Sequence, residues 1–393
     1  MSIYFDNSAT TQVRKEVADA MVDFITSNYG NPSSIHEIGR TSYKAMALAR
    51  KRVSGLLNCS PTEIYFAGCG TFANNLAILG RARFAEANGH GKHLITSKIE
   101  HPAITGPANF LEAQGWKVTF LDVDEEGFIK VEQLKNAITS ETSIISIMWA
   151  NNEIGTLQPI KEMACMVEEI CKKEEREIFF HTDAVQACGK VKIDLKDVPV
   201  SALSISGHKF HAPKGIGALF LRRGFNVMPI TFGGGQEKGL MPGTESMPNI
   251  VALGMAAELA SQELESSASR LKEMQEFMFD ELASIDGVHV TGTRDLKRRL
   301  PGHVSIAVSD CEGEALVMQL DLKGICCSSA SACHKGIVEP SHVLSALNVP
   351  CSLVRGSVRI SMGKFNTMDE CKEAVALMKT VFEGQKSSTP ATI

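Results

Sequence analysis

The chain has 393 residues, 44% of them hydrophobic and 22% charged, which suits a large folded domain with a smaller one and excludes disordered and fibrous classes. The formal net charge is −5 and no long basic block occurs, so nucleic-acid binding has no electrostatic support. No apolar run reaches membrane-spanning length, and the first residues lack the layout of a signal peptide. The 11 cysteines are odd in number and dispersed, which favours a reducing, cytoplasmic location over a disulfide framework.

Short apolar runs alternate with helical patterns through most of the chain. Strands are expected at 63–67, 93–96, 117–121, 144–149, 178–181 and 203–205. A helix is expected at 72–87, and strands that alternate with helices predict a mostly parallel sheet covered on both faces.

The pattern changes after about residue 251. A long helix is expected at 252–279, a second helix at 312–322, and short strands at 288–290 and 304–308. We therefore expect a small α+β domain at 256–393, a large domain at 16–255, and an N-terminal segment, 1–15, that packs with the small domain.

The most informative stretch is 206–209, Ser-Gly-His-Lys, which follows an apolar run. A lysine at a strand end, beside a histidine and a small hydroxyl residue, is typical of enzymes that use an amine covalently. Such an amine must lose its proton in a partly desolvated pocket. The alternative is that Lys209 is one solvated lysine among many.

Four other segments carry candidate site residues, each with an ordinary structural alternative. Gly70 and Thr71 lie at a strand-to-helix turn, where a helix N-terminus can hold phosphate, or where they simply form a capped turn. Asp183 follows a strand and could pair with a pyridinium nitrogen or cap the next helix. His101 could stack on a ring or cap a helix, and Arg359 could clamp a carboxylate or sit on an edge strand.

The segment 326–336 is rich in small residues and is interpreted as a mobile loop with little reason to form a helix or strand. His334 and Lys335 follow Cys333, and cationic neighbours favour a thiolate. Buried structural cysteines are the alternative. A metal site built from Cys326, Cys327 and Cys333 lacks standard zinc spacing, so no metal is expected.

Together, and in this order, these segments resemble the fold-type I pyridoxal phosphate (PLP) enzymes, and within them the cysteine desulfurases of the class V aminotransferase-like group, NifS/IscS-like branch. The resemblance runs from 4–11, through 30–34, to 359–363, and covers nearly the whole chain. It implies an α/β fold with a mostly parallel seven-stranded sheet between helices and a smaller C-terminal domain.

The resemblance also implies an activity. L-cysteine would give alanine and a persulfide on Cys333, and that sulfur would pass to an iron–sulfur scaffold or another acceptor protein. A homodimer is implied as well. A selenocysteine lyase and another class V lyase or aminotransferase stay as alternatives, and a metal-binding scaffold is the alternative from a different class.

The resemblance also implies the roles of individual residues. Lys209, His101 and Cys333 would be catalytic: Lys209 would hold the cofactor covalently, His101 would stack on its ring, and Cys333 would attack the substrate sulfur. The cofactor-binding residues would be Gly70, Thr71, His101, Asn152, Asp183, Gln186, Ser206, His208, Lys209 and Thr244, the last from the partner subunit. The substrate would be held by Asn7, Ala9, Asn152 and Arg359.

Three short segments depart from the family pattern. Met241-Pro242 stands where the family usually has Arg-Ser, and Phe72 replaces an acidic residue beside Thr71. His334-Lys335 replaces the common Thr-Ser after the cysteine.

Overall fold

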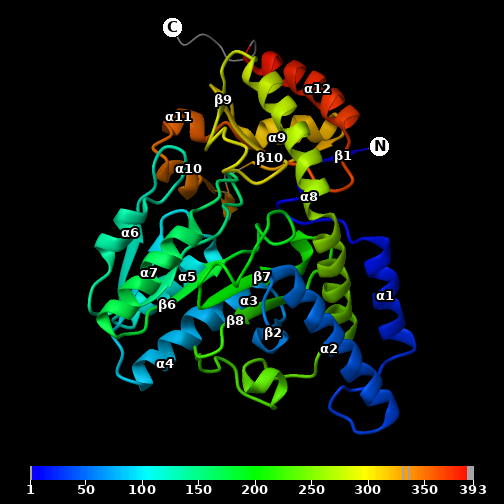
Figure 1. Ribbon diagram of the computed structural model, residues 1–393. Coiled ribbons are helices and arrows are strands. Elements are labelled where there is room, and N and C mark those ends of the chain that lie inside the picture. The colour runs from blue at the N-terminus through cyan, green and yellow to red at the C-terminus, as the bar shows by residue number, and fades with distance from the viewer. Residues whose placement is uncertain (1, 330–331, 335–336, 387–393) are drawn as a thin grey trace.

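The computed structural model of the protein describes residues 2–329, 332–334 and 337–386. The larger part is a seven-stranded sheet with helices on both faces, and a smaller part is built around a three-stranded sheet (Figure 1). The strands of the large sheet are β2 (Ile64–Ala67), β3 (His93–Ser97), β4 (Lys117–Leu121), β5 (Thr142–Ser146), β6 (Phe179–Asp183), β7 (Ala202–Ser206) and β8 (Gly217–Leu221).

The large sheet has the strand order β2-β8-β7-β6-β5-β3-β4. Strand β8 runs antiparallel to both of its neighbours, and the other pairs in the sheet are parallel. Every residue of β5, β6 and β7 is buried, as continuous apolar runs predict for strands covered on both faces. The predicted mostly parallel α/β fold is confirmed.

Helices cover the two faces of this sheet. They are α1 (Lys15–Thr26), α2 (Glu37–Leu57), α3 (Gly70–Asn75), α4 (Arg81–Ala87), α5 (Pro102–Ala113), α6 (Val131–Ala137), α7 (Ile160–Glu174) and the first half of α8 (Met247–Ala283). A π-helical turn, η2 (Leu76–Gly80), joins α3 to α4, so the predicted helix at 72–87 is continuous. Short 3-10 turns lie at η1 (Pro61–Glu63), η3 (Gly207–Lys209) and η4 (Gln236–Gly239).

The smaller part contains an antiparallel sheet in the order β14-β10-β9. Its strands are β9 (Val288–Val290), β10 (His303–Val308) and β14 (Ser357–Ser361). Its helices are α9 (Gly313–Leu322), α10 (His342–Ala346), α11 (Cys351–Val354) and α12 (Met368–Lys386). Two further pairs of short strands are β1 (Ile3–Tyr4) with β11 (Ile325–Cys326), and β12 (Ala332–His334) with β13 (Ile337–Glu339).

Helix α8 connects the two parts and runs from beside α1 and α2 to the small sheet (Figure 1). Its residues Ile250 and Leu253 belong to a core under the large sheet, whereas Met274 and Met278 belong to the core of the smaller part. Phe5 joins that second core, where it is fully buried. The division of the chain at 15/16 and 255/256 stays a prediction, and α8 continues through the second of these positions.

Three details of the predicted elements are wrong. The apolar run 144–149 gives a regular strand only to Ser146, although the amides of Ile147 and Trp149 still donate to the carbonyls of His181 and Asp183 in β6. Strand β8 was not expected. The described part of 326–336 contains a strand, β12, in which the backbone of Cys333 pairs with Val338 of β13. Two consecutive β-branched residues, Ile337 and Val338, favour this pairing.

No helix in the described part of the chain combines the length and apolar character needed to cross a bilayer.

Candidate active site

A cavity of about 390 Å³ opens at the carboxyl ends of the central strands of the large sheet. In open α/β sheets this edge is where ligands bind, because loops from neighbouring strands converge there. Most of the predicted site residues line it: Ala9, Gly70, Thr71, His101, Asn152, Asp183, Gln186, Ser206, His208, Lys209 and Arg359.

Lys209 lies in η3, directly after β7, and its amine points at the N-terminal segment. The Nζ atom donates to the carbonyl oxygens of Ser8 and Ala9, both at 2.7 Å. Burial and the nearby Arg359 guanidinium lower the pKa of Lys209 to about 8, although Asp6 and Asp183 oppose this shift. About one tenth of the amine is therefore unprotonated at pH 7, far more than for an ordinary lysine, and covalent chemistry at an amine requires this form.

Asp183 is a buried carboxylate at the end of β6. Its Oδ2 atom accepts a hydrogen bond from Asn74 Nδ2 at 2.7 Å, and its Oδ1 atom accepts one from the Val185 amide at 2.9 Å. Burial raises the pKa of Asp183, and His101 and Lys209 act against that rise. A cationic ring nitrogen placed here would compensate the buried charge.

His101 caps helix α5, and the same residue lines the cavity. Its Nδ1 atom accepts a hydrogen bond from the Ala103 amide at 3.0 Å, so the neutral ring carries its proton on Nε2. Burial lowers the pKa of His101 and keeps the ring neutral. Capping does not exclude a role beside a ring, because His101 caps α5 through Nδ1 and also lines the cavity.

Donors for an anionic group gather where β2 and β7 end. Thr71, in the first turn of α3, and Ser206, at the end of β7, line the cavity together with His208. A Cβ atom at Gly70 would lie 2.8 Å from Val185 Cγ2 and 3.1 Å from Ser206 Cβ, so only glycine allows the backbone this close.

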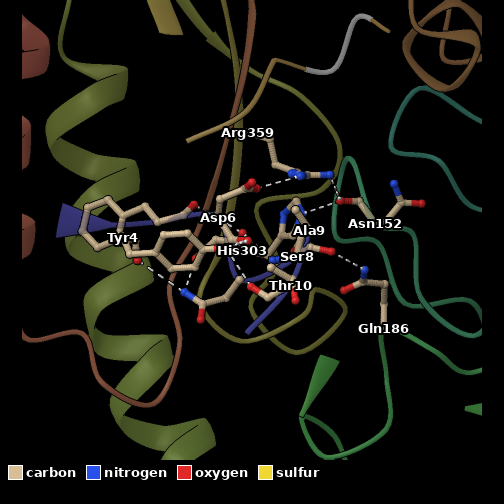
Figure 2. A network of polar contacts seen from close by, with 12 residues as sticks. Tyr4, Asp6, Ser8, Ala9, Thr10, Asn152, Gln186, His303 and Arg359 are labelled. Atoms are coloured by element: carbon tan, nitrogen blue, oxygen red, sulfur yellow. Dashed lines mark hydrogen bonds and ion pairs between the residues drawn. The ribbon is translucent and has the colours of Figure 1, made fainter. Parts of the chain in front are cut away.

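Hydrogen bonds fix the side-chain amide of Gln186, and the turn formed by Asn151 places Asn152 beside the cavity. Gln186 Nε2 donates to the Ser8 carbonyl at 2.9 Å (Figure 2). Its Oε1 accepts from Lys190 Nζ at 2.8 Å. Asn151, rather than Asn152, forms the turn after β5, because its Oδ1 accepts from the amides of Glu153 and Ile154. The side chain of Asn152 is left to line the cavity.

Arg359 extends from β14 into the cavity wall and is 8% exposed. Its Nη2 atom contacts Asp6 Oδ1 at 2.8 Å, and its Nη1 atom donates to the Asn152 carbonyl at 3.2 Å (Figure 2). Its Nε atom has no hydrogen-bond partner among the described residues. The guanidinium therefore retains capacity for a carboxylate ligand.

Two predicted residues, Asn7 and Thr244, do not line this cavity. Asn7 lies on the other side of Lys209, in a second cavity of about 60 Å³, where Nδ2 donates to the Ser361 carbonyl at 2.9 Å. Thr244 lines a separate hollow of about 260 Å³ together with Phe72 and Met241, two of the departures from the family pattern. The side chain of Cys333 lies outside the described part of the structure.

Sequence analysis did not identify several residues that hydrogen-bond to the predicted site residues. Asn74 stands one helical turn after Gly70, so i, i+4 spacing could have placed it on the same face. Asp6, Lys190 and His303 gave no comparable local signal, because their partners are remote in the chain. Among the described residues, no group of three or more His, Cys, Asp or Glu gathers in a way that could hold a metal ion.

Comparison with known proteins agrees with this geometry. The model of the class-V aminotransferase family matches residues 3–373. The chain belongs to this family. It is 45% identical over 391 residues to a protein named cysteine desulfurase IscS from Methanosarcina thermophila, covering 100% of this chain and 94% of that one.

Solved structures extend the family relationship to the whole fold. A NifS-like protein superposes with a TM-score of 0.90 and 34% identity, covering 98% of this chain and 100% of the other. A protein described as SspA in complex with cysteine superposes with a TM-score of 0.79 and 32% identity, covering 93% of this chain and 100% of the other. This class-V aminotransferase is thus similar along its length to cysteine desulfurases.

Proposed function

We propose that this class-V aminotransferase is a cysteine desulfurase that uses PLP. The similarity to named cysteine desulfurases over the full length supports the reaction. The observation that carries the proposal is the Lys209 amine, whose pKa is lowered to about 8, in a cavity shared with Asp183, His101 and Arg359.

The cavity residues fit this cofactor on two grounds. Gly70, where a Cβ atom would press against Val185 and Ser206, lines the cavity together with the hydroxyl residues Thr71 and Ser206, and hydroxyl and amide donors at a helix N-terminus suit a phosphate. Asp183 is a buried carboxylate with a raised pKa and suits a protonated ring nitrogen. When bound, PLP supplies a covalent link for an amine and a ring that withdraws electrons from the substrate's α-carbon.

The remaining roles belong to the chain itself. Arg359 binds the substrate carboxylate, and Asn152 lies beside it. The Lys209 amine removes and returns the α-proton, since its lowered pKa lets it act as a base near neutral pH. His101 presents a neutral ring face, and Gln186, oriented by Lys190, presents its amide to the cofactor's ring oxygen.

The Cys333 thiolate takes the sulfur. Its sulfur forms a bond to the sulfur of L-cysteine as the substrate's carbon–sulfur bond breaks, and protons return to carbon. L-cysteine and the Cys333 thiol thereby become L-alanine and a Cys333 persulfide. Asn7 and Ala9 bind near the substrate, and Thr244 acts from a partner subunit in a homodimer.

The persulfide passes to an iron–sulfur scaffold or another sulfur-acceptor protein in the cytoplasm, where a reducing environment suits 11 dispersed cysteines. A selenocysteine lyase is the second candidate, favoured by His334 directly after Cys333. Turnover of L-cysteine and L-selenocysteine, measured side by side, separates the two.

The test is alanine formation from L-cysteine by the purified protein supplied with PLP. The wild type is expected to turn over and to bind PLP with visible colour, and Lys209→Ala to release no alanine catalytically. A colourless wild type after PLP addition, or sustained turnover by Lys209→Ala, would overturn the proposal. Cys333→Ala separates an aminotransferase, which would keep its activity, from a desulfurase.

A further inference from the structure

A buried histidine stands directly behind the wall of the cavity. His303, the first residue of β10, is 2% exposed, and its Nε2 atom lies 3.1 Å from the carbonyl oxygen of Asn152. The same carbonyl accepts from Arg359 Nη1 at 3.2 Å (Figure 2). One oxygen atom of the Asn152 turn thus joins His303 to Arg359, which lines the cavity.

The imidazole of His303 is held neutral with a fixed proton. Burial holds the pKa of His303 well below its ordinary value. Positive charges on Arg299 before β10, Arg359 on β14 and Lys190 after β6 act in the same direction, and the contact with the Asn152 carbonyl opposes them. A carbonyl accepts only from a donor, so the proton of the neutral ring is on Nε2.

Packing alone does not explain an imidazole at this position. His303 Nδ1 has no hydrogen-bond partner among the described residues, and the buried Arg299 leaves its Nε and Nη2 atoms without one. Gly155 lies against both side chains, because a Cβ atom there would approach His303 Nδ1 to 2.8 Å and Arg299 Cγ to 3.1 Å. An apolar side chain of similar volume would avoid this unpaired nitrogen, so the contact with Asn152 is what the imidazole provides.

The contact matters when Arg359 changes partner. Arg359 is anchored to Asp6 through Nη2 at 2.8 Å, whereas its contact with the Asn152 carbonyl is longer, at 3.2 Å. If Arg359 turned to a substrate carboxylate, the carbonyl would lose this donor. A buried carbonyl without a donor is costly, but His303 would still supply one.

We propose that His303 is a positioning residue that holds the Asn152 carbonyl while Arg359 transfers to the carboxylate of the amino acid substrate. The proposal rests on the proposed function for the identity of that substrate. It does not depend on which thiol receives the sulfur. His303 touches neither substrate nor cofactor, and its effect falls on substrate binding.

The test compares His303→Leu, which removes the donor, with His303→Gln, whose amide can still donate to the carbonyl. His93→Leu is the matched control. His93 is also buried, but it is the first residue of β3, at the amino ends of the large sheet's strands and away from the cavity. In PLP-loaded protein, KM for L-cysteine should rise about tenfold in His303→Leu, equivalent to about 1.4 kcal/mol. His303→Gln and His93→Leu should stay within about threefold, and kcat should change little.

A second readout uses the cofactor-free protein. Amide hydrogen exchange at Glu153 and Ile154, in the turn after Asn152, should accelerate in His303→Leu and in neither of the other variants. An unchanged KM and exchange rate in His303→Leu, an equal defect in His303→Gln, or a fall in kcat at constant KM would each overturn the proposal. A wild type that forms no alanine would instead refute the proposed function, and the exchange comparison would still test the contact.

Discussion

The pH dependence of Lys209 reactivity gives the sharpest test of the site's electrostatics. With a pKa of about 8, roughly one tenth of the Lys209 amines are unprotonated at pH 7 and nine tenths at pH 9. Reactivity should therefore rise about tenfold over this interval and then level off. An amine with the ordinary value of 10.5 would gain about a hundredfold without levelling.

The causes of this shift can be varied one at a time. Arg359→Gln removes a positive charge that lowers the pKa of Lys209, so the midpoint should move to higher pH. Asp6→Asn removes a negative charge that raises it, so the midpoint should move to lower pH.

The assay labels cofactor-free protein with a small amine-reactive reagent at a series of pH values. The Lys209 peptide is then quantified by mass spectrometry against N-α-acetyl-lysine added to the same solution. A wild-type midpoint near 10, or variants that shift in the same direction, would refute this account of how the amine is activated.

Three further predictions follow from buried groups near the site. Burial raises the pKa of Glu100 to about 8. The stability that its protonated form gives the fold is therefore complete below about pH 4.5 and is lost as the pH rises towards 8. Glu100→Gln should match the wild type in urea unfolding near pH 5 and be more stable at pH 9, by up to about 4–5 kcal/mol; equal pH profiles would contradict this. Lys190→Met frees the Gln186 amide to turn, so PLP should bind the cofactor-free protein about tenfold more weakly, while the exposed control Lys192→Met should bind normally. Gly70→Ala forces Val185 to move and should lower PLP occupancy with little change in secondary structure by circular dichroism. Full occupancy would show that PLP binding does not need the close packing of Gly70 against Val185.

Local sequence signals predicted the parts of the site that lie at strand ends. Lys209, Asp183 and Thr71 each follow a recognisable apolar run, and parallel strands bring such ends to one edge of the sheet. The sequence could not decide whether His101 caps a helix or lines the cavity. The residue does both, because its Nδ1 atom caps α5 while its ring lines the cavity.

The supporting contacts could not be predicted, since they join segments far apart in the chain. Arg359 meets Asp6 across 353 positions, and His303 meets Asn152 across 151. No periodicity or motif records such a pair. The apolar run 144–149 shows a related limit, because burial and hydrogen bonds to β6 both continue past Ser146, where the regular strand ends.

The central claim is that sulfur leaves L-cysteine at this cavity and is carried away on Cys333. The most direct measurement is the mass of the Cys333 peptide, isolated without reductant after the PLP-loaded protein has met L-cysteine. The account predicts a peptide heavier by one sulfur atom in the wild type, and no gain in Lys209→Ala. A wild-type peptide of unchanged mass alongside alanine formation, or the extra sulfur on Cys326 or Cys327 instead, would contradict it.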